Sequence, residues 1–414
     1  GYSDNVVISN GDAVGASIFE SQVQQDQPTI DALNVLGVDS WTAGNHEFDR
    51  GAADYHDRIS PATNGPDLAA NVTKADGSQF LDPYTIITTP SGLRVGVIGA
   101  VTNETPSLVS PSGIEGLTFG DPVEAVNKYA DALTDGNAAN GEADIVIASY
   151  HEGGPVSDDE AGDLKSEVFT HLVKDTSSKV NAIFNAHTHQ TYSYEIAGPD
   201  GVERPVIQAG SYAEKIGQVV FTLDASNKVT KADLSVVKAD GIPASVASDP
   251  KIAKIQTIIA DAKAKADELG APVVGAADNI TRAYTGWTTT AVDPATGVVT
   301  GTHGGDDRGN ASSLGDLVAD SMLDAANGRE GQEPVDGGVI NPGGLRADLD
   351  ANKDGKVTVK EAAGVLPFAN TLDIVTLTGA DLKQALEQQW QPAASSRAYL
   401  QLGLSDSITY TFDS

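Results

Sequence analysis

The first half of the chain alternates short apolar runs with stretches of helical pattern, and this alternation limits the fold more than any other feature. Each run is rich in Val and Ile and is bounded by turn residues, as buried strands are. The runs are Asn5–Ile8, Arg94–Val101, Asp144–Ala148 and Val180–Phe184. A helical pattern lies between some of them, such as Thr29–Leu36, which ends at Gly37. Strands that alternate with helices predict a layered α/β domain.

Short polar clusters lie at the presumed ends of strands, and four of the seven histidines fall in them. The clusters are Ser9–Ser17, Gly44–Gly51, Tyr150–Gly154 and Asn185–Gln190. In open α/β sheets, ligands bind at the carboxyl ends of the strands. We therefore expect the four clusters to converge on one site.

These clusters supply oxygen and imidazole ligands without sulfur. The candidate metal ligands are Asp12, Asn45, His151, His187 and His189. Such a set suits Zn²⁺, Mn²⁺, Co²⁺ or Fe better than Ca²⁺, which prefers oxygen ligands alone. One residue separates His187 from His189, so in an extended segment both side chains point to the same side. They are then placed to bind one metal ion or two adjacent ions.

The composition restricts the possible partners. The chain has 58 acidic and 26 basic side chains, a formal charge of −32 over 414 residues. A surface that binds nucleic acid needs a basic patch, so we expect no nucleic-acid partner. A small anionic ligand stays possible, because metal ions reverse the local charge. The absence of cysteine removes disulfides and thiol chemistry, and no apolar run reaches the roughly 18 residues of a transmembrane segment.

Residues 248–270 have the pattern of one long helix, with a Pro in the first turn and a Gly after the end. The helix separates two regions of different character, which favours an interdomain linker. The alternative is a helix packed within one domain. After Gly270 the sequence is richer in Gly and Asp, with helical stretches at Ser313–Ala326 and Leu382–Trp390. We interpret residues 271–414 as a second, α+β domain.

The order of the motifs Gly-Asp, GNHEFD, HEGG and HTH resembles that of the calcineurin-like metallophosphoesterases. In the second half, SLGDLVAD, NPGGLR, PFANTL and TLTGADL resemble the C-terminal domain of bacterial secreted 5′-nucleotidases, which include UDP-sugar hydrolases and 2′,3′-cyclic phosphodiesterases. The resemblance covers most of the chain. It implies an α/β sandwich with a dimetal site over residues 1–247, a linker helix over 248–270 and an α+β 5′-nucleotidase domain over 271–414.

The resemblance implies an enzyme that releases phosphate from nucleotides by attack of a metal-bound hydroxide. The implied cofactors are two divalent ions, Zn²⁺ or Mn²⁺. Their implied ligands are Asp12 as the bridge, Asn45, His151 and His187 on one ion, and His189 on the other. His46 would face the phosphate and the leaving group, and Asp49 would orient its imidazole.

The second domain supplies the implied contacts to a small nucleotide. They are Arg308, Asn341, Gly343, Arg346 and Phe368. A guanidinium suits a terminal phosphate, while Asn341 would contact the base or ribose and Phe368 would stack on the base. The family is secreted, which implies an extracellular, cell-surface or periplasmic location.

Three departures from the family pattern stand out. The family opens with an Asp-x-His motif on the first strand, and no such motif precedes Asp12. The chain stops before the family's final Gly-Gly-Asp segment, and Ala186 stands where the family usually has Gly. Because the chain starts at Gly1 and its only methionine is Met322, we expect it to be a piece of a longer protein.

The segment DANKDGKVTVKE, residues 350–361, matches the template of a calcium-binding loop. The candidate ligands are Asp350, Asn352, Asp354, Lys356 through its carbonyl, and Glu361. Gly355 takes the position of the sharp turn. The alternative is an acidic Gly turn that leads into a strand.

Two other functions stay open at this point. One is a related phosphoesterase that acts on cyclic nucleotides or nucleotide sugars. The other is a non-catalytic surface or binding protein that kept the fold.

Overall fold

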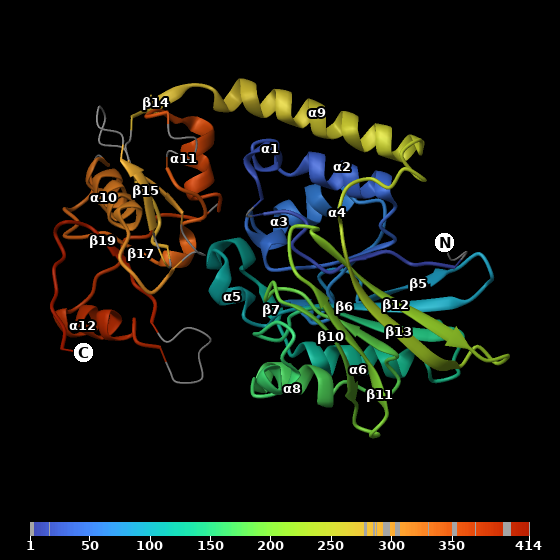
Figure 1. Cartoon of the computed structure of the whole chain (residues 1–414). Coiled ribbons are helices and arrows are strands. Elements are labelled where there is room, and N and C mark those ends of the chain that lie inside the picture. The colour runs from blue at the N-terminus through green and yellow to red at the C-terminus, as the bar shows by residue number, and fades with distance from the viewer. Residues whose placement is uncertain are drawn as a thin grey trace. The chain divides into compact units, whose positions relative to one another are not determined.

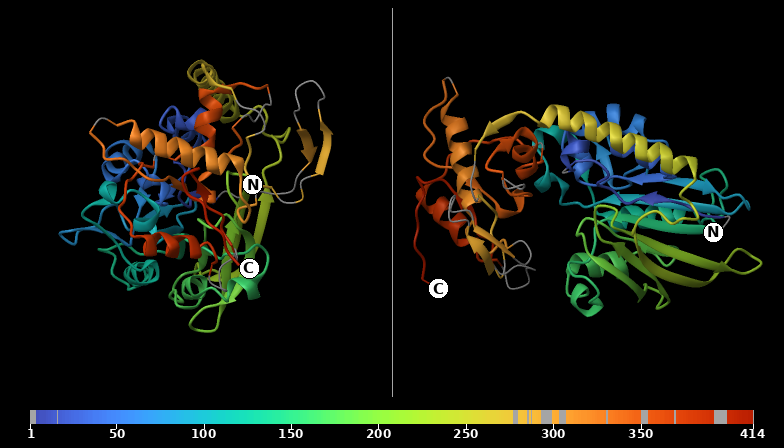
Figure 2. Two further views of the ribbon diagram at one scale, coloured as in Figure 1. Left: turned by 90° about the vertical axis from the view of Figure 1, so that its left-hand side faces the viewer. Right: turned by 45° about the horizontal axis from the view of Figure 1, so that its top comes forward.

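The chain folds into two compact units, one of residues 1–15 and 24–260 and the other of residues 16–23 and 261–414 (Figures 1 and 2). The division falls inside the long helix α9 (Pro250–Gly270). Residues 16–23, inside the range interpreted from the sequence as the first domain, group with the second unit. The computed structural model describes residues 4–15, 17–276, 280–284, 286, 288–292, 299–302, 307–329, 331–349, 354–368, 370–391 and 399–413.

A six-stranded sheet forms the centre of the first unit, in the order β10-β11-β9-β8-β6-β5. The four inner strands are parallel and each edge strand is antiparallel to its neighbour. The strands are β5 (Tyr84–Thr88), β6 (Arg94–Val101), β8 (Ile145–His151), β9 (Ala182–Phe184), β10 (Thr191–Ala197) and β11 (Glu203–Ala209). Among the runs predicted from the sequence, Arg94–Val101 is confirmed to the residue, Asp144–Ala148 is shifted by one to three residues, and Val180–Phe184 is shortened to its last three residues.

A second, parallel sheet of three short strands has the order β1-β2-β3. Its strands are β1 (Ile8–Ser9), β2 (Ser40–Thr42) and β3 (Asp67–Leu68). The strand predicted at Asn5–Ile8 thus overlaps β1 only at Ile8. The remaining strands of this unit are the antiparallel pair β4 (Val72–Lys74) and β7 (Leu117–Phe119), and the hairpin of β12 (Lys215–Leu223) and β13 (Val229–Lys238).

The side chains of β8 show how the central sheet is buried on both faces. Val146, Ala148 and Tyr150 pack with α6 (Pro122–Ala132) and α8 (Glu167–Lys174), which lie together along one face in Figure 1. Ile145 and Ile147 point to the opposite face, where β1, β3 and the β12–β13 hairpin pack. Helices on one face and strands on the other confirm the predicted α/β sandwich. The alternation also fixes the face of the last residue of β8, His151.

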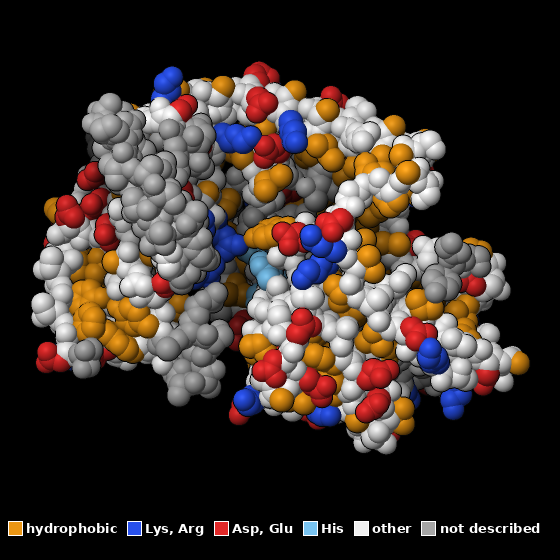
Figure 3. All heavy atoms as spheres, in the orientation of Figure 1, with side chains coloured by type: hydrophobic (Ala, Val, Ile, Leu, Met, Phe, Trp, Pro, Cys, Tyr) orange, Lys and Arg blue, Asp and Glu red, His pale blue; other side chains and the backbone are white. Residues whose placement is uncertain are grey.

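The shorter helices of this unit lie in the connections between the strands. They are α2 (Gln27–Leu36), α3 (Ala52–Asp54), α4 (Ser60–Ala62), α5 (Thr105–Leu108) and α7 (Glu160–Asp163). Among the described residues, no helix is both long and apolar enough to span a membrane. Acidic side chains are scattered over the visible face in Figure 3, as the negative net charge leads one to expect.

The second unit is α+β and has its own small core. Leu314 and Val318 of α10 (Ser313–Asn327) pack with Leu345 and with Val365 of α11 (Val359–Val365). Its strand pairs are β14 (Val273–Gly275) with β18 (Val357–Thr358), β15 (Thr288–Val292) with β16 (Val299–Thr302), and β17 (Val339–Ile340) with β19 (Gly403–Leu404). The other helices are α1 (Phe19–Gln22) and α12 (Gly379–Glu387). Both helical stretches predicted after Gly270 are present, as α10 and α12.

Arg204 of β11 is 6% exposed and donates only to backbone carbonyl oxygens in the contacts that the structure defines. Its guanidinium lies 2.6 Å from the oxygens of Ser177 and Thr176, and farther from those of Val173 and Val180. These carbonyls belong to the end of α8 and the turn after it, where the helix dipole is negative. The arginine therefore ties α8 to the sheet.

We predict that Arg204→Met lowers the free energy of unfolding by about 3 kcal/mol, because buried carbonyls lose a charged donor. Urea denaturation followed by circular dichroism measures the change. The matched control is Arg94→Met, because the side chain of Arg94 is 43% exposed and reaches Asp144 at 3.6 Å. Such a surface ion pair contributes at most about 1 kcal/mol. Equal losses in the two variants would contradict the role of Arg204.

Candidate metal centre

Loops at the carboxyl ends of β1, β2, β8 and β9 bring most of the candidate ligands together. One ligand atom from each of Asp12, His151 and His187 lies within 4.8 Å of the other two. Oδ1 of Asn45 is 3.2 Å from Nε2 of His151. Parallel strands deliver their ends to the same edge of a sheet, and this places four residues far apart in the sequence around one point.

The imidazole of His151 is 1% exposed, and its two nitrogens have different surroundings. Nδ1 lies 2.8 Å from the carbonyl oxygen of Asn10, so it carries the proton of that hydrogen bond. Nε2 then faces Oδ2 of Asp12 at 3.0 Å and Oδ1 of Asn45 at 3.2 Å. A nitrogen lone pair among oxygens requires a proton or a metal ion. The residues present therefore fit a divalent metal, with Asn10 setting the tautomer.

The charges of the cluster favour the metal-binding forms of Asp12 and His187. Burial alone would raise the pKa of Asp12, but the charges of His151 and His46 hold it well below its usual value. Burial and the nearby His151 lower the pKa of His187, which keeps this imidazole neutral. Burial would also lower the pKa of His151, but the carboxylate of Asp12 raises it. Metal ligation needs an ionised carboxylate and neutral imidazoles, and a cation between these groups would take the place of the proton on His151.

Glu47 is a buried residue of this site to which the sequence assigned no role. Its side chain is 4% exposed, and its carboxylate accepts from the backbone N–H groups of Asp12 at 2.9 Å, Ala13 at 2.8 Å and Gly44 at 2.6 Å. Burial and then the charge of Asp12 raise the pKa of Glu47 to about 7. Its place inside GNHEFD was the one available signal.

Glycine is required where these loops touch. A Cβ on Gly44 would lie 2.2 Å from Oδ1 of Asp12, and a Cβ on Gly11 would lie 2.4 Å from Nδ1 of His151. Gly11 also has a φ of +92°, a conformation that side chains disfavour. The two glycines thus allow the ligand loops to approach each other closely.

His46 lies beside the cluster and forms a pair with Asp49. Its Nδ1 is 2.9 Å from Oδ2 of Asp49, and its backbone N–H donates to Oδ1 of Asp12 at 3.0 Å. Burial would lower the pKa of His46, but the hydrogen bond to Asp49 and the charge of Asp12 raise it to about 9. The arrangement can hold a cationic imidazole next to an anionic ligand.

The expectation that His187 and His189 share one side of an extended segment is wrong. Both have left-handed backbones, with φ of +67° and +61°. The ring of His187 packs on His151, with centroids 5.2 Å apart, while the ring of His189 packs on Tyr212 at 5.8 Å. A left-handed turn breaks the twofold alternation of a strand, so the two rings meet different neighbours. The cluster of Asp12, His151 and His187 does not include His189.

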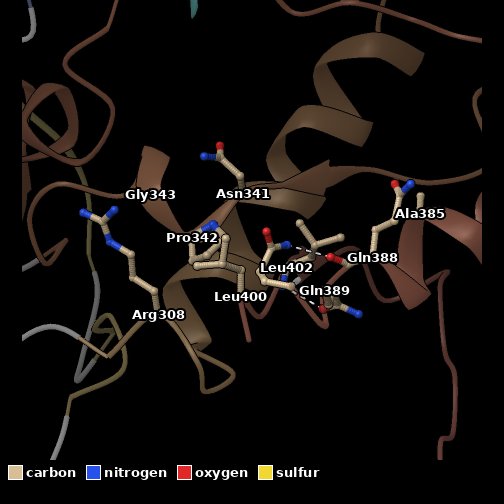
Figure 4. A pocket seen from close by; sticks show the side chains of 10 residues that line it. Arg308, Asn341, Pro342, Gly343, Ala385, Gln388, Gln389, Leu400 and Leu402 are labelled. Atoms are coloured by element: carbon tan, nitrogen blue, oxygen red, sulfur yellow. Dashed lines mark hydrogen bonds between the residues drawn. The ribbon is translucent and has the colours of Figure 1, made fainter. Parts of the chain in front are cut away.

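The second unit brings together some of the predicted substrate residues. Arg308, Asn341 and Gly343 line a pocket of about 280 Å³ (Figure 4). Pro342 of the same NPGGLR motif also lines it, whereas no motif indicated Gln388 and Gln389 at the α12 end or Leu400 and Leu402. Arg346 and Phe368 are not in that lining. They contact each other, with the guanidinium carbon 5.7 Å from the ring centroid.

Only part of the predicted calcium loop can be compared, because Asp350 and Asn352 lie outside the described residues. Gly355 has a φ of +76°, as a sharp turn needs. Asp354 accepts from the N–H of Lys356 at 2.9 Å. Glu361 accepts from the N–H and the hydroxyl of Thr358 and so caps α11. These bonds serve the turn and the helix, and calcium binding stays a prediction.

Residues 2–191 match the family model of the calcineurin-like phosphoesterases, and residues 288–414 match that of the 5′-nucleotidase C-terminal domain. The chain carries a calcineurin-like phosphoesterase domain in its first unit. Its second unit is of the 5′-nucleotidase type, so the resemblance drawn from the motifs is confirmed.

Similar proteins come from several bacteria. The chain is 28% identical to endonuclease YhcR of Bacillus subtilis (strain 168), over 99% of this chain and 30% of that protein. It is 29% identical to the cell wall protein Lmo0130 of Listeria monocytogenes, over 99% of this chain and 52% of that protein. It thus spans about half or less of these relatives. The fold is that of the crystal structure of a 5′-nucleotidase precursor from Thermus thermophilus, with a TM-score of 0.65 and 21% identity over 97% of this chain and 72% of that one.

We predict that Glu47→Leu lowers the free energy of unfolding by about 3 kcal/mol, because three backbone N–H groups lose their acceptor in a buried place. Chemical denaturation measures it. Glu104→Leu is the control, because Glu104 is exposed. If both variants lose equally little, the ligand loops do not depend on Glu47.

Proposed function

We propose that this chain is a metal-dependent phosphohydrolase that releases phosphate from nucleotides. The observation that carries the proposal is the buried Nε2 of His151, directed at oxygens of Asp12 and Asn45 next to the His46–Asp49 pair. The calcineurin-like phosphoesterase domain of the first unit supports the reaction class, and the 5′-nucleotidase type of the second unit supports nucleotides as substrates.

Asp12, Asn45, His151 and His187 would hold one divalent ion, and Asp12 with His189 would contribute to a second. Zn²⁺ and Mn²⁺ are the ions that these ligands suit. When bound, such ions polarise phosphoryl oxygens and supply a nucleophile near neutral pH.

The protein side chains around the ions would orient and stabilise the reacting groups. A protonated His46 would offset the charge that develops on the leaving oxygen. Asp49 keeps the imidazole in place through its bond to Nδ1. In the second unit, Arg308 and Arg346 would bind phosphate oxygens through their guanidinium forks. Asn341 and Gly343 would contact the ribose or base, and Phe368 would stack on the base.

Two further properties belong to this proposal. We infer an extracellular or cell-surface location, which the relation to a cell wall protein supports. The small nucleotide is favoured over a polynucleotide, although one relative is described as an endonuclease, because the net charge of −32 repels a polyanion.

A phosphate-release assay over a panel of substrates tests the function. The full chain, loaded with Mn²⁺ or Zn²⁺, should release phosphate from nucleoside 5′-monophosphates, and a chelator should remove this activity. Cleavage of cyclic nucleotides or nucleotide sugars alone would favour a related phosphoesterase. Metal binding without turnover of any substrate would favour a binding protein that kept the fold.

We predict that His46→Ala lowers kcat by about 100-fold or more while bound metal is unchanged, since the imidazole stabilises charge in the transition state. Asp49→Asn should lower kcat less, because Asp49 acts only by orienting His46. Steady-state kinetics and elemental analysis measure both quantities. His56→Ala is the matched control, because His56 also pairs with an aspartate but on the surface. A parallel loss of metal would make His46 a ligand.

A further inference from the structure

Gln208 is buried at the end of β11, with 2% of its surface exposed. Its Oε1 accepts from the N–H of Gln190 at 2.9 Å and from the hydroxyl of Thr188 at 3.1 Å. Its Nε2 lies 2.9 Å from Oγ1 of Thr188 and 3.0 Å from the hydroxyl oxygen of Tyr192. An amide has two donor and two acceptor positions, and the described contacts engage the side chain at both ends.

The segment that Gln208 contacts carries two of the candidate metal ligands. Thr188 stands between His187 and His189, and both histidines have the left-handed backbone that non-glycine residues disfavour. Such a conformation persists only where surrounding contacts enforce it, and it is often found at functional sites. Among the side chains, Gln208 supplies two of these contacts, at Thr188 and at Gln190.

The same side chain reaches the turn that follows His151. The hydroxyl of Tyr192, which contacts Gln208, accepts from the N–H of Gly154 at 2.9 Å. A Cβ on Gly153 would lie 2.4 Å from Nε2 of Gln208 and 3.0 Å from Oγ1 of Thr188. The turn after His151 is therefore packed directly against Gln208 and Thr188. Both imidazoles of the cluster, His151 and His187, belong to segments that meet at Gln208.

We propose that Gln208 is a positioning residue for the metal centre. It fixes the His187–Gln190 segment against the His151–Gly154 turn, and so sets how tightly and in what geometry Asp12, His151 and His187 hold a divalent ion. This inference rests on the metal site of the proposed function. It assigns Gln208 no contact with the ion.

The physical reason is preorganisation. Without the amide, the segment relaxes toward right-handed or extended backbone conformations, and the imidazole of His187 leaves the position facing His151. The ion then loses a ligand for part of the time. Outer residues that orient metal ligands typically change metal affinity by about 10- to 100-fold when they are replaced.

Metal titration of folded protein measures the effect directly. We expect Gln208→Leu to weaken the binding of Mn²⁺ or Co²⁺ to the metal-free chain by about 10- to 100-fold. It should also change the visible absorption of bound Co²⁺, which reports the ligand geometry. The control is Gln218→Leu, the same replacement on the neighbouring hairpin, where Gln218 is exposed and its one described partner is Ser235 at 3.4 Å. That variant should bind both ions as the unsubstituted chain does.

A second pair of variants separates positioning from general damage to the fold. Thr188→Val removes the hydroxyl that meets Gln208 and should weaken metal binding, whereas Thr188→Ser keeps the hydroxyl and should retain the affinity to within about threefold. The double variant Gln208→Leu with Thr188→Val should bind metal no more weakly than the worse single variant. The reason is that both changes break the same contact, between Gln208 and Thr188. If Gln208→Leu fails to fold, the comparison of Thr188→Val with Thr188→Ser still tests the proposal.

The outcomes distinguish this inference from the proposed function. If folded Gln208→Leu and Thr188→Val bind metal with unchanged affinity and an unchanged Co²⁺ spectrum, Gln208 only supports the fold and the inference is overturned. If the losses of metal affinity in the two single variants add in the double variant, Gln208 and Thr188 act separately. The proposal that they act through one shared contact is then also wrong. If the unsubstituted chain itself binds neither ion, the metal site and the proposed function fail together with it.

Discussion

The buried carboxylate of Glu47 is the contact on which the candidate site depends. It joins the loop after β1 to the loop after β2 by accepting from three backbone N–H groups. A carboxylate held out of water is costly unless it is hydrogen-bonded, and three donors offset that cost. Because these bonds hold the two loops together, the carboxylate of Asp12, the amide of Asn45 and the imidazole of His46 are fixed next to the end of β8. The backbone N–H of His46 adds a further bond between these two loops, by donating to Oδ1 of Asp12.

The protein concentrates opposing charges within that small volume. Asp12 has a lowered pKa and Glu47 a raised one, although both are buried carboxyl groups. His151 and His187 likewise have pKa values that shift in opposite directions. The difference arises because the charges of two imidazoles outweigh the effect of burial on Asp12, whereas burial and the charge of Asp12 raise the pKa of Glu47. Pairs of like groups with divergent pKa values are typical of functional sites. The carboxylate and imidazole groups gathered here are of the kinds that bind a divalent ion.

The ligand loops are supported from two directions. Glu47 holds the segments of Asp12 and Asn45, and Gln208 contacts the segments of His151 and His187. Neither side chain is a candidate ligand, and each uses its polar atoms on the backbone or hydroxyl groups of the loops. The second unit has a separate pocket, lined by Arg308 and Asn341 together with residues at the end of α12. The reaction and the substrate that these features serve belong to the proposed function.

The sequence by itself indicated β8 and β9, two of the strands that carry the site, and the resemblance that the family models confirm. Arg94–Val101 and the run that becomes β8 could be predicted because both faces of these strands are apolar, and the motifs after the strands identified the ligand types. The sequence did not reveal β2, because the three residues SWT make a run too short and too polar to recognise. It also wrongly predicted an extended segment with His187 and His189 on one side, since a left-handed turn at two histidines has no periodic signature.

Only the tertiary structure decided which buried polar residues hold the ligands in place. In the sequence, nothing about periodicity or composition distinguishes Glu47 and Gln208 from other polar residues. Their roles arise from contacts with loops that are 34 or 35 residues away for Glu47 and 18 to 20 residues away for Gln208. Such contacts depend on how the chain returns on itself, which local composition and periodicity do not encode.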